Sequence, residues 1–425
     1  MPRVKKIIIA LICLYVFLIP LQTHWLYDQK LINDEPWQYG ALKIFATELL
    51  FFVILCLAIF YFFKKSWAII TWRFSWLKTG AIFSLLLMCA LNFYFAINRD
   101  IAFYKLTIYI QALALFFLLF AVRIGWEKIS CALVLSGAVQ SIFAIIQFAS
   151  QKVFASKWLG MASQNPATFR TPVVETTDGR WLRAFGTFSH PNILAGFLVF
   201  AILCGIYLLM NKGTTNRNAC PASGGAKIML AGSIALNSVG LAFTFSRAAI
   251  IALFIALVFL IFFFVNKQNR EDHQFKMFAA ALGLIVISFL CISLAFPSLI
   301  LTRVNGGQRL EVKSNSERIA EYKMAPTLFK NYWLFGVGAG NYTLAKDAIQ
   351  SQLALPKLGV GGYQPIHNAI LLEIIEFGIV GILLLIGFVI SILKIAPKLF
   401  LFNSFSTLLL SALLILSIFD HYLSS

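Results

Sequence analysis

The chain has 425 residues, of which 60% are hydrophobic and 12% are charged, and its mean hydropathy is +0.84. A soluble protein of this length would need a far more polar surface, so the composition excludes an ordinary soluble domain. The formal net charge of +18 would suggest nucleic acid binding in a soluble protein, but its distribution along this chain argues against that.

Eleven apolar segments account for most of the chain, and each approaches the length that a membrane-spanning helix needs. The hydrocarbon core of a bilayer is about 30 Å thick, which takes about 20 residues of helix. Backbone amides inside hydrocarbon need partners within the same segment, so helices are predicted here and strands are not. We therefore predict an all-α, polytopic membrane bundle in which residues 1–425 form one integral domain. The predicted spans are 7–21, 41–63, 79–97, 103–122, 129–149, 192–210, 228–245, 248–265, 277–296, 368–393 and 399–419.

The first span follows a basic N-terminal segment, Pro2–Lys6, a pattern that signal peptides share. No small-residue cleavage site follows it, so we expect an uncleaved first helix. With the N-terminus placed in the cytoplasm, most lysines and arginines of the short loops fall on the inner side, and few fall on the outer side. This positive-inside pattern predicts a multi-pass protein of the bacterial inner membrane with a cytoplasmic N-terminus.

Two long polar segments, residues 150–190 and 297–366, interrupt the spans on the outer, periplasmic side of the predicted topology. Together they carry 13 lysines and arginines against six acidic residues. Long loops cross the membrane largely regardless of their charge, so topology does not require this basic excess. The excess therefore suggests an anionic ligand on the outer face.

The second polar segment is too long for a structureless loop, so short helices are predicted over the membrane face. Ser314 and Glu317 have capping-box spacing, which predicts a helix over residues 316–330. The glycines of Gly336–Gly340 then interrupt the chain, and another short helix is expected from about Tyr342. These glycines also imitate a dinucleotide-binding loop, but no buried strand precedes them, so a turn is the better interpretation.

Six of the seven cysteines lie inside apolar segments, and none lies in the two outer segments. No cysteine pair has the spacing of zinc ligands, so disulfides, a structural metal and a cofactor are not expected. The 42 phenylalanines and nine tryptophans suit lipid-facing surfaces and interfacial belts rather than base stacking, so no nucleic acid partner is predicted.

Arginines at the outer ends of apolar segments are the first candidates for a binding site. Arg183 lies just before the sixth predicted span, and Arg247 stands at a sharp junction between two apolar segments. Arg247 alone is explained equally well by snorkelling to lipid phosphates, and Arg318 alone by a solvated helix face. Together, three planar guanidinium groups would hold a bridging pyrophosphate through paired hydrogen bonds.

His367 precedes the tenth predicted span, at a helix N-terminus whose dipole favours a neutral imidazole. A neutral imidazole beside cationic groups could act as general base on a hydroxyl nucleophile, although a lone histidine is more often structural. His190 precedes a proline and suits a helix cap instead. Glu373 and Glu376 lie inside the tenth span, where a helix–helix hydrogen bond or a charge partner is the simpler explanation.

These residues occur in a set of motifs that resembles the O-antigen ligase and O-antigen polymerase superfamily of bacterial inner-membrane glycosyltransferases. The similarity covers about residues 180–385 and depends on the order and spacing of the motifs, since no single one is specific. The motifs are RAFGTFSHPN at Arg183–Asn192, TFSRA at Thr244–Ala248, Ser316–Arg318 with the LFGVG turn at Leu334–Gly338, and His367-Asn368 with Glu376, Gly378 and Gly381.

The ending Phe419–Tyr422 also resembles a late outer motif of this superfamily, whose members usually have twelve spans. A further helix usually follows that motif in relatives, whereas this chain stops at Ser425. A truncated C-terminus on the outer side is therefore expected.

The resemblance implies a metal-independent enzyme that moves a glycan from undecaprenyl pyrophosphate to an acceptor hydroxyl at the periplasmic face, with inversion of the anomeric centre. Carried over by position, Arg183 and Arg247 would hold the pyrophosphate, Arg318 would assist from the loop, and His367 would activate the acceptor. Other motif residues are candidates for supporting roles, namely His190, Asn192, Asn368 and Glu376.

The acceptor stays open at this point. It would be lipid A–core or a similar surface polymer for a ligase, a second lipid-linked glycan for a polymerase, and a protein for an O-oligosaccharyltransferase. A flippase or transporter of a lipid-linked sugar is the alternative from another class, and a structural membrane subunit is a third. Transport favours charged or broken helices near the bilayer midplane, whereas the polar residues of this chain gather at the outer edge.

Overall fold

The computed structural model describes residues 2–32, 34–64, 76–168, 171–177, 179–211, 224–266, 272–305, 309–352, 363–395, 412–413 and 416–417. Helices dominate these ranges, and the chain is a polytopic helical membrane protein, as predicted. Seven of the described helices are long and apolar enough to cross a membrane. They are α2 (Ala46–Lys64), α4 (Arg99–Val122), α5 (Trp126–Ser150), α6 (Pro191–Met210), α7 (Gly224–Phe243), α9 (Asp272–Ala295) and α13 (Ala369–Ile395).

Three further helices coincide with predicted spans: α1 (Pro2–Leu18), α3 (Trp76–Tyr94) and α8 (Arg247–Asn266). Each of the first ten predicted spans therefore overlaps one helix. The eleventh, 399–419, and the motif Phe419–Tyr422 lie outside the described residues, except for short helical pieces at residues 412–413 and 416–417.

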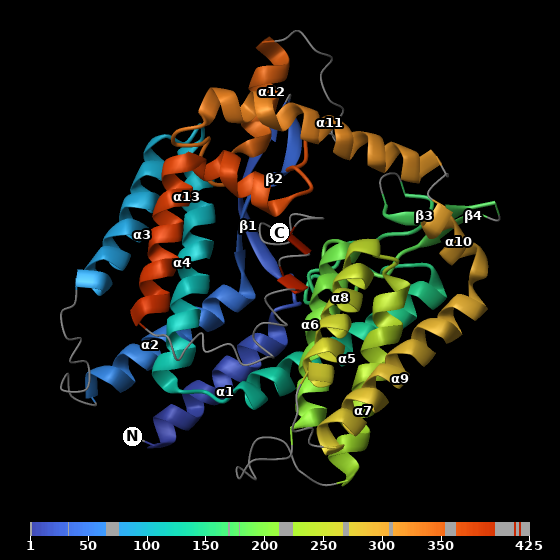
Figure 1. Ribbon diagram of the computed structural model, residues 1–425. Coiled ribbons are helices and arrows are strands. Elements are labelled where there is room, and N and C mark those ends of the chain that lie inside the picture. Colours follow the sequence, from blue (N-terminus) through green and yellow to red (C-terminus); the bar gives the residue numbers. More distant parts are fainter. Residues whose placement is uncertain are drawn as a thin grey trace.

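The helices form two groups, with α5–α9 on one side of the molecule and α3, α4 and α13 on the other (Figure 1). In the first group, α5, α7, α8 and α9 all pack against α6. A helix that is apolar on every face is stable when protein surrounds it, and Leu194, Leu198 and Ile202 of α6 are fully buried. The N-terminal helix α1 packs against both α2 and α5 and so connects the two groups.

Two antiparallel hairpins depart from the predicted topology. The chain forms β1 (His24–Ile32) and β2 (Glu35–Phe45) before α2, so the predicted span 41–63 begins inside a strand. Polar residues of β1, such as Gln29 and Lys30, interrupt the apolar pattern before residue 41. Asp34 adopts φ 63° at the turn between the two strands. In the first outer segment, β3 (Val173–Thr176) pairs with β4 (Gly179–Leu182).

The second outer segment contains the two predicted helices as α11 (Arg309–Tyr332) and α12 (Tyr342–Gln352), together with an unpredicted helix, α10 (Pro297–Asn305). The predicted start at residue 316 is wrong, because α11 already begins at Arg309 and Ser314 lies inside it. A guanidinium nitrogen of Arg309 lies 3.1 Å from the Glu175 carboxylate of β3, which anchors the first turn. From there α11 runs across the molecule to α12 and the start of α13 (Figure 1).

The glycine-rich segment Gly336–Gly340 is a turn, as predicted, and it packs against a break in α13. Gly378 interrupts that helix with φ 64°, and Gly336 faces it with φ 76°. The amide of Gly338 donates to the carbonyl of Glu376 (3.0 Å), and the amide of Ile379 donates to the carbonyl of Trp333 (2.8 Å). A Cβ on Gly336 would meet the Glu376 main chain, so only glycine permits this approach of two backbones.

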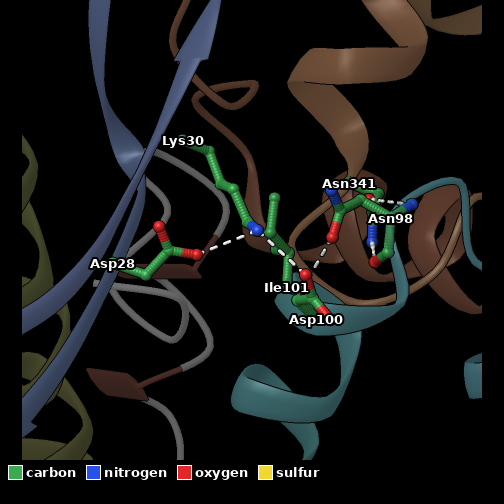
Figure 2. Close-up of polar contacts among 6 residues, drawn as sticks. All are labelled: Asp28, Lys30, Asn98, Asp100, Ile101 and Asn341. Atoms are coloured by element: carbon green, nitrogen blue, oxygen red, sulfur yellow. Dashed lines mark hydrogen bonds and ion pairs between the residues drawn. The ribbon is translucent and has the colours of Figure 1, made fainter.

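Polar contacts fix the start of α12 to the membrane helix α4 (Figure 2). The amide of Asn98 donates to the side-chain oxygen of Asn341 (2.9 Å), whose own amide group donates back to the Asn98 carbonyl (3.2 Å). Beside them, Lys30 of β1 contacts Asp100 (2.8 Å) and Asp28 (2.9 Å), and these hydrogen bonds raise the pKa of Lys30. The start of α12 is therefore anchored to α4, and α4 is anchored to the first hairpin.

Candidate functional site

One candidate site is built around the turn Thr244–Ser246, which joins α7 to α8. Phe245 adopts the left-handed conformation there, with φ 49°. The Nε of Arg183 donates to the carbonyl of Thr244 (2.7 Å), and Arg303 donates from two nitrogens to the carbonyl of Phe245 (3.1 and 2.6 Å). Arg247 follows directly as the first residue of α8, with an exposed side chain. We call Arg183, Arg247 and Arg303 the arginine group.

Arg183 is 7% exposed and is held from two directions. Besides its bond to the Thr244 carbonyl, its terminal nitrogen donates to the Asn192 side-chain oxygen (2.6 Å). The Asn192 amide in turn donates to Nδ1 of His190 (3.1 Å), which caps α6. The predicted capping role of His190 is confirmed, and Asn192 supports Arg183 directly.

Two buried glutamines of α5 position the irregular segment that carries Arg183. The side-chain oxygen of Gln147 accepts from the amides of Phe185 (3.0 Å) and Gly186 (2.9 Å), and that of Gln140 accepts from the amide of Thr187 (2.8 Å). Non-helical backbone inside a membrane bundle needs such partners, because no water reaches it. The sequence contains a signal for this contact, since both glutamines interrupt an apolar span.

The hydrogen bonds of Arg183 and Arg303 described above go to neutral oxygens, so none of these bonds cancels a positive charge. The geometry brings Arg183 and Arg247 onto one turn, as their predicted shared role requires. It also adds Arg303, which in the sequence is only one of the basic residues of the second outer segment. An anion, and a phosphate in particular, is the ligand that this cluster suits.

A second candidate site lies at the N-terminus of α13. Nδ1 of His367 is 2.9 Å from the carboxylate of Glu321 on α11, and the His367 amide donates to the same oxygen (3.2 Å). The hydroxyl of Tyr322 donates to the His367 carbonyl (3.2 Å). A carboxylate accepts and does not donate, so the proton of the neutral imidazole lies on Nδ1 and the lone pair on Nε2. We call His367 and Glu321 the histidine pair.

The other charged residues of this region come from α11 and α12. Lys346 is buried, and burial lowers the pKa of its ammonium group while Glu321 and then Glu317 oppose the shift. Burial, followed by the charges of Glu321 and Glu376, raises the pKa of the Tyr342 hydroxyl. Arg318 lies one turn before Glu321, half-buried, and its Nε has no hydrogen-bond partner among the described residues.

Asn368 and Glu376 have structural contacts. The Asn368 side chain accepts from the amide of Leu371 (2.9 Å) and so caps α13. The Glu376 carboxylate accepts from the Gly340 amide (2.7 Å), which holds the glycine turn against α13. Glu373 accepts from the Tyr109 hydroxyl (3.0 Å), so the predicted helix–helix hydrogen bond is confirmed for this residue. Asn368 therefore caps the helix that follows His367, and Glu376 holds the glycine turn.

The two sites face the same end of the molecule, and α11 reaches from one to the other (Figure 1). Near its start α11 contacts Glu175 beside α10, and three turns later it supplies Glu321 to His367. The contacts described above hold each site together but do not join the arginine group to the histidine pair. The idea that one substrate bridges the two sites stays a prediction. The described residues also contain no group of three or more His, Cys, Asp or Glu side chains that could hold a metal ion.

Comparison with known proteins identifies one family. Residues 232–386 match the family described as O-antigen ligase. The matched segment contains Arg247, Arg303, Arg318, Glu321 and His367, while Arg183 lies before it. No curated protein matches the chain. The resemblance found in the sequence motifs is thereby confirmed over this segment.

Proposed function

Because residues 232–386 form an O-antigen ligase domain, we propose that the protein transfers a glycan from undecaprenyl pyrophosphate to an acceptor hydroxyl. The reaction would take place at the periplasmic face of the bacterial inner membrane. Among the acceptors of this superfamily we favour lipid A–core or a similar surface polymer, as for a ligase. Extension of a second lipid-linked glycan and transfer to a protein are the alternatives.

The arginine group would bind the donor pyrophosphate. Arg183 and Arg303 are fixed by main-chain oxygens, and this fixes the turn from which Arg247 extends. When the glycosidic carbon–oxygen bond breaks, negative charge develops on the departing pyrophosphate. Positive groups that are already oriented stabilise that charge without having to reorganise during the reaction.

The histidine pair would activate the acceptor. Nε2 of His367 would take the hydroxyl proton while the acceptor oxygen forms its bond to the anomeric carbon from the side opposite the pyrophosphate. The electron pair of the broken bond leaves with undecaprenyl pyrophosphate, and the anomeric centre is inverted. The Glu321 carboxylate, hydrogen-bonded to Nδ1, would orient the imidazole and stabilise the imidazolium that forms.

The single observation that carries this proposal is the His367–Glu321 contact at the mouth of α13, inside the matched segment and on the same end as the arginine group. A histidine with only a structural role needs no buried carboxylate on Nδ1. In a general base such a carboxylate stabilises the protonated form that catalysis generates.

One feature of the structure matches a transporter, namely the break of α13 at Gly378 inside a membrane span. Broken helices line substrate paths in transporters. Here, however, main-chain groups of the glycine turn satisfy the groups around the break: the amides of Ile379 and Val380 bond to Trp333 and Leu334. The glycine turn of the same chain therefore packs against the break, which leaves no reason to assign the break to a substrate path. We retain glycan transfer as the proposed function.

The test is an in vitro transfer assay with purified protein, a lipid-linked glycan and several acceptors, namely lipid A–core, a second lipid-linked glycan and an acceptor protein, with and without EDTA. We expect glycosidic bond formation with release of undecaprenyl pyrophosphate, and no effect of EDTA. Flipping of the donor across vesicles without any bond formation would overturn the proposal in favour of transport. The acceptor that reacts separates ligase, polymerase and protein glycosyltransferase.

A further inference from the structure

A groove of about 660 Å³ lies between α1 and α5, away from both candidate sites. Its lining contains small residues, among them Ala10, Cys13 and Ala132, and larger apolar side chains such as Phe17. Lys6, near the start of α1, and Lys128, near the start of α5, also line it. The deep end is fixed by the hydroxyl of Ser136, which donates to the Phe17 carbonyl (2.7 Å).

The sequence of α1 explains why this groove exists. Ile8, Ile12 and Val16 recur at helical spacing and are buried against α2 and α5. The neighbouring stripe begins at Lys6, continues through Ala10 and Cys13 and ends at Phe17, and it faces outward beside α5. Small side chains in the middle of this stripe leave the helices separated at the surface, and the larger residues at its edges form the walls.

The mouth of the groove carries charge that other described residues do not neutralise. Neither Lys6 nor Lys128 forms an ion pair with another described residue. Lys6 belongs to α1 and Lys128 to α5, so the groove offers an anionic group one lysine from each helix. Lysines at the end of an apolar helix lie at the level of lipid phosphates.

The length of the groove matches one leaflet of a bilayer. Lys6 and Phe17 are eleven positions apart on α1, which corresponds to about 16 Å along a helix. One half of the hydrocarbon core is about 15 Å thick. A lipid with its phosphate at the two lysines would therefore place an acyl chain along the whole groove and end near the bilayer midplane.

We propose that this groove is a binding site for an anionic phospholipid of the leaflet that borders the N-terminus of α1. The phosphate lies between Lys6 and Lys128, and one acyl chain lies over Ala10, Cys13 and Ala132. By the predicted topology this is the cytoplasmic leaflet, opposite the proposed transfer site. The site is independent of the transfer reaction, so its test does not depend on enzymatic activity.

The test is native mass spectrometry of the purified full chain with phosphatidylglycerol and with phosphatidylcholine of the same acyl chains. We expect the anionic lipid to bind more tightly. The variant Lys6→Gln/Lys128→Gln should bind it about thirtyfold more weakly, since each lysine near a lipid surface contributes about 1 kcal/mol. The matched control is Lys5→Gln/Lys64→Gln, which removes the same charge from residues outside the groove and should bind nearly as tightly as the unaltered protein.

A second variant separates a lipid site from a simple phosphate site. Cys13→Phe keeps both lysines but fills the space between α1 and α5, so it should lose the bound lipid. Free inorganic phosphate is tested separately and should bind weakly to every variant. Equal binding of the two lipids, equal loss in the control, or full lipid retention in Cys13→Phe would each overturn the proposal.

Discussion

Arg183 and Arg303 donate hydrogen bonds to main-chain oxygens of the Thr244–Ser246 turn, whereas His367 is held by the carboxylate of Glu321. In the arginine group, these hydrogen bonds go to neutral main-chain oxygens. In the histidine pair, the partner Glu321 carries a negative charge, which would stabilise a protonated imidazole. In the proposed reaction the first site would bind an anion and the second would take a proton.

This difference follows from what each task requires. A pyrophosphate brings its own negative charge, so carboxylate partners on the arginines would compete with it. A general base instead acquires charge during the reaction, and a nearby carboxylate stabilises the new charge. The comparison predicts that substitutions at the histidine pair reduce turnover, whereas substitutions at the arginine group also weaken donor binding.

The largest effect is expected for His367→Ala, which removes the proposed base. Transfer should fall about a thousandfold, because general base catalysis contributes on that scale. The in vitro transfer rate is the measurement, with the thermal unfolding midpoint of the protein in detergent as the check on folding. His24→Ala is the matched control, since His24 is exposed on β1, and it should transfer normally. Normal turnover of His367→Ala would remove the proposed role of the histidine pair.

Arg247→Lys should reduce transfer about a hundredfold, because an ammonium group does not reproduce the paired hydrogen bonds of a guanidinium group. Unlike the histidine variant, it should also raise KM for the lipid-linked donor. Arg309→Lys is the control, as Arg309 is exposed and paired with Glu175 at the start of α11. Full activity of Arg247→Lys would mean that this arginine only reaches lipid phosphates.

Glu321→Gln should lower turnover about thirtyfold, since hydrogen bonds to charged groups contribute about 2 kcal/mol. KM for the donor should not change, because Glu321 acts through His367 and touches no substrate in the proposed reaction. The ratio of the effects on kcat and KM is therefore the informative measurement. Glu317→Gln is the control on the same helix. A change in KM without a change in kcat would assign Glu321 to donor binding and contradict the comparison.

The sequence predicted much of the bundle and the residues with charged side chains at the outer face. Ten predicted spans coincide with helices because membrane spans are continuous apolar segments, whose signal is local. The partners of the site residues were not predicted, because Glu321 meets His367 across 46 positions and Arg303 meets Phe245 across 58. The first hairpin was not predicted, because the end of β2 is as apolar as the start of α2. Composition therefore placed the start of the predicted span 41–63 inside that strand.

Arg303→Lys tests whether the unpredicted member of the arginine group matters, and the expected effect is about a fivefold loss of transfer. The lysine retains the charge but replaces two donors on the Phe245 carbonyl with one, and a lost hydrogen bond contributes about 1 kcal/mol. KM for the donor should rise more than kcat falls, because the turn that carries Arg247 is less firmly held. An effect on kcat alone would place Arg303 with the histidine pair.

Arg318→Gln should have the smallest effect, about a threefold rise in KM for the donor. Arg318 lies on α11, one turn from Glu321, and is only partly buried, so solvent screens part of any charge it contributes. Combining this variant with Arg247→Lys makes the comparison sharper. If Arg318 and Arg247 hold the same pyrophosphate, the double variant should deviate from the product of the two single effects, as expected for residues that share a ligand. Strictly multiplicative effects would assign Arg318 to the solvated face of α11 and limit the anion site to the arginine group.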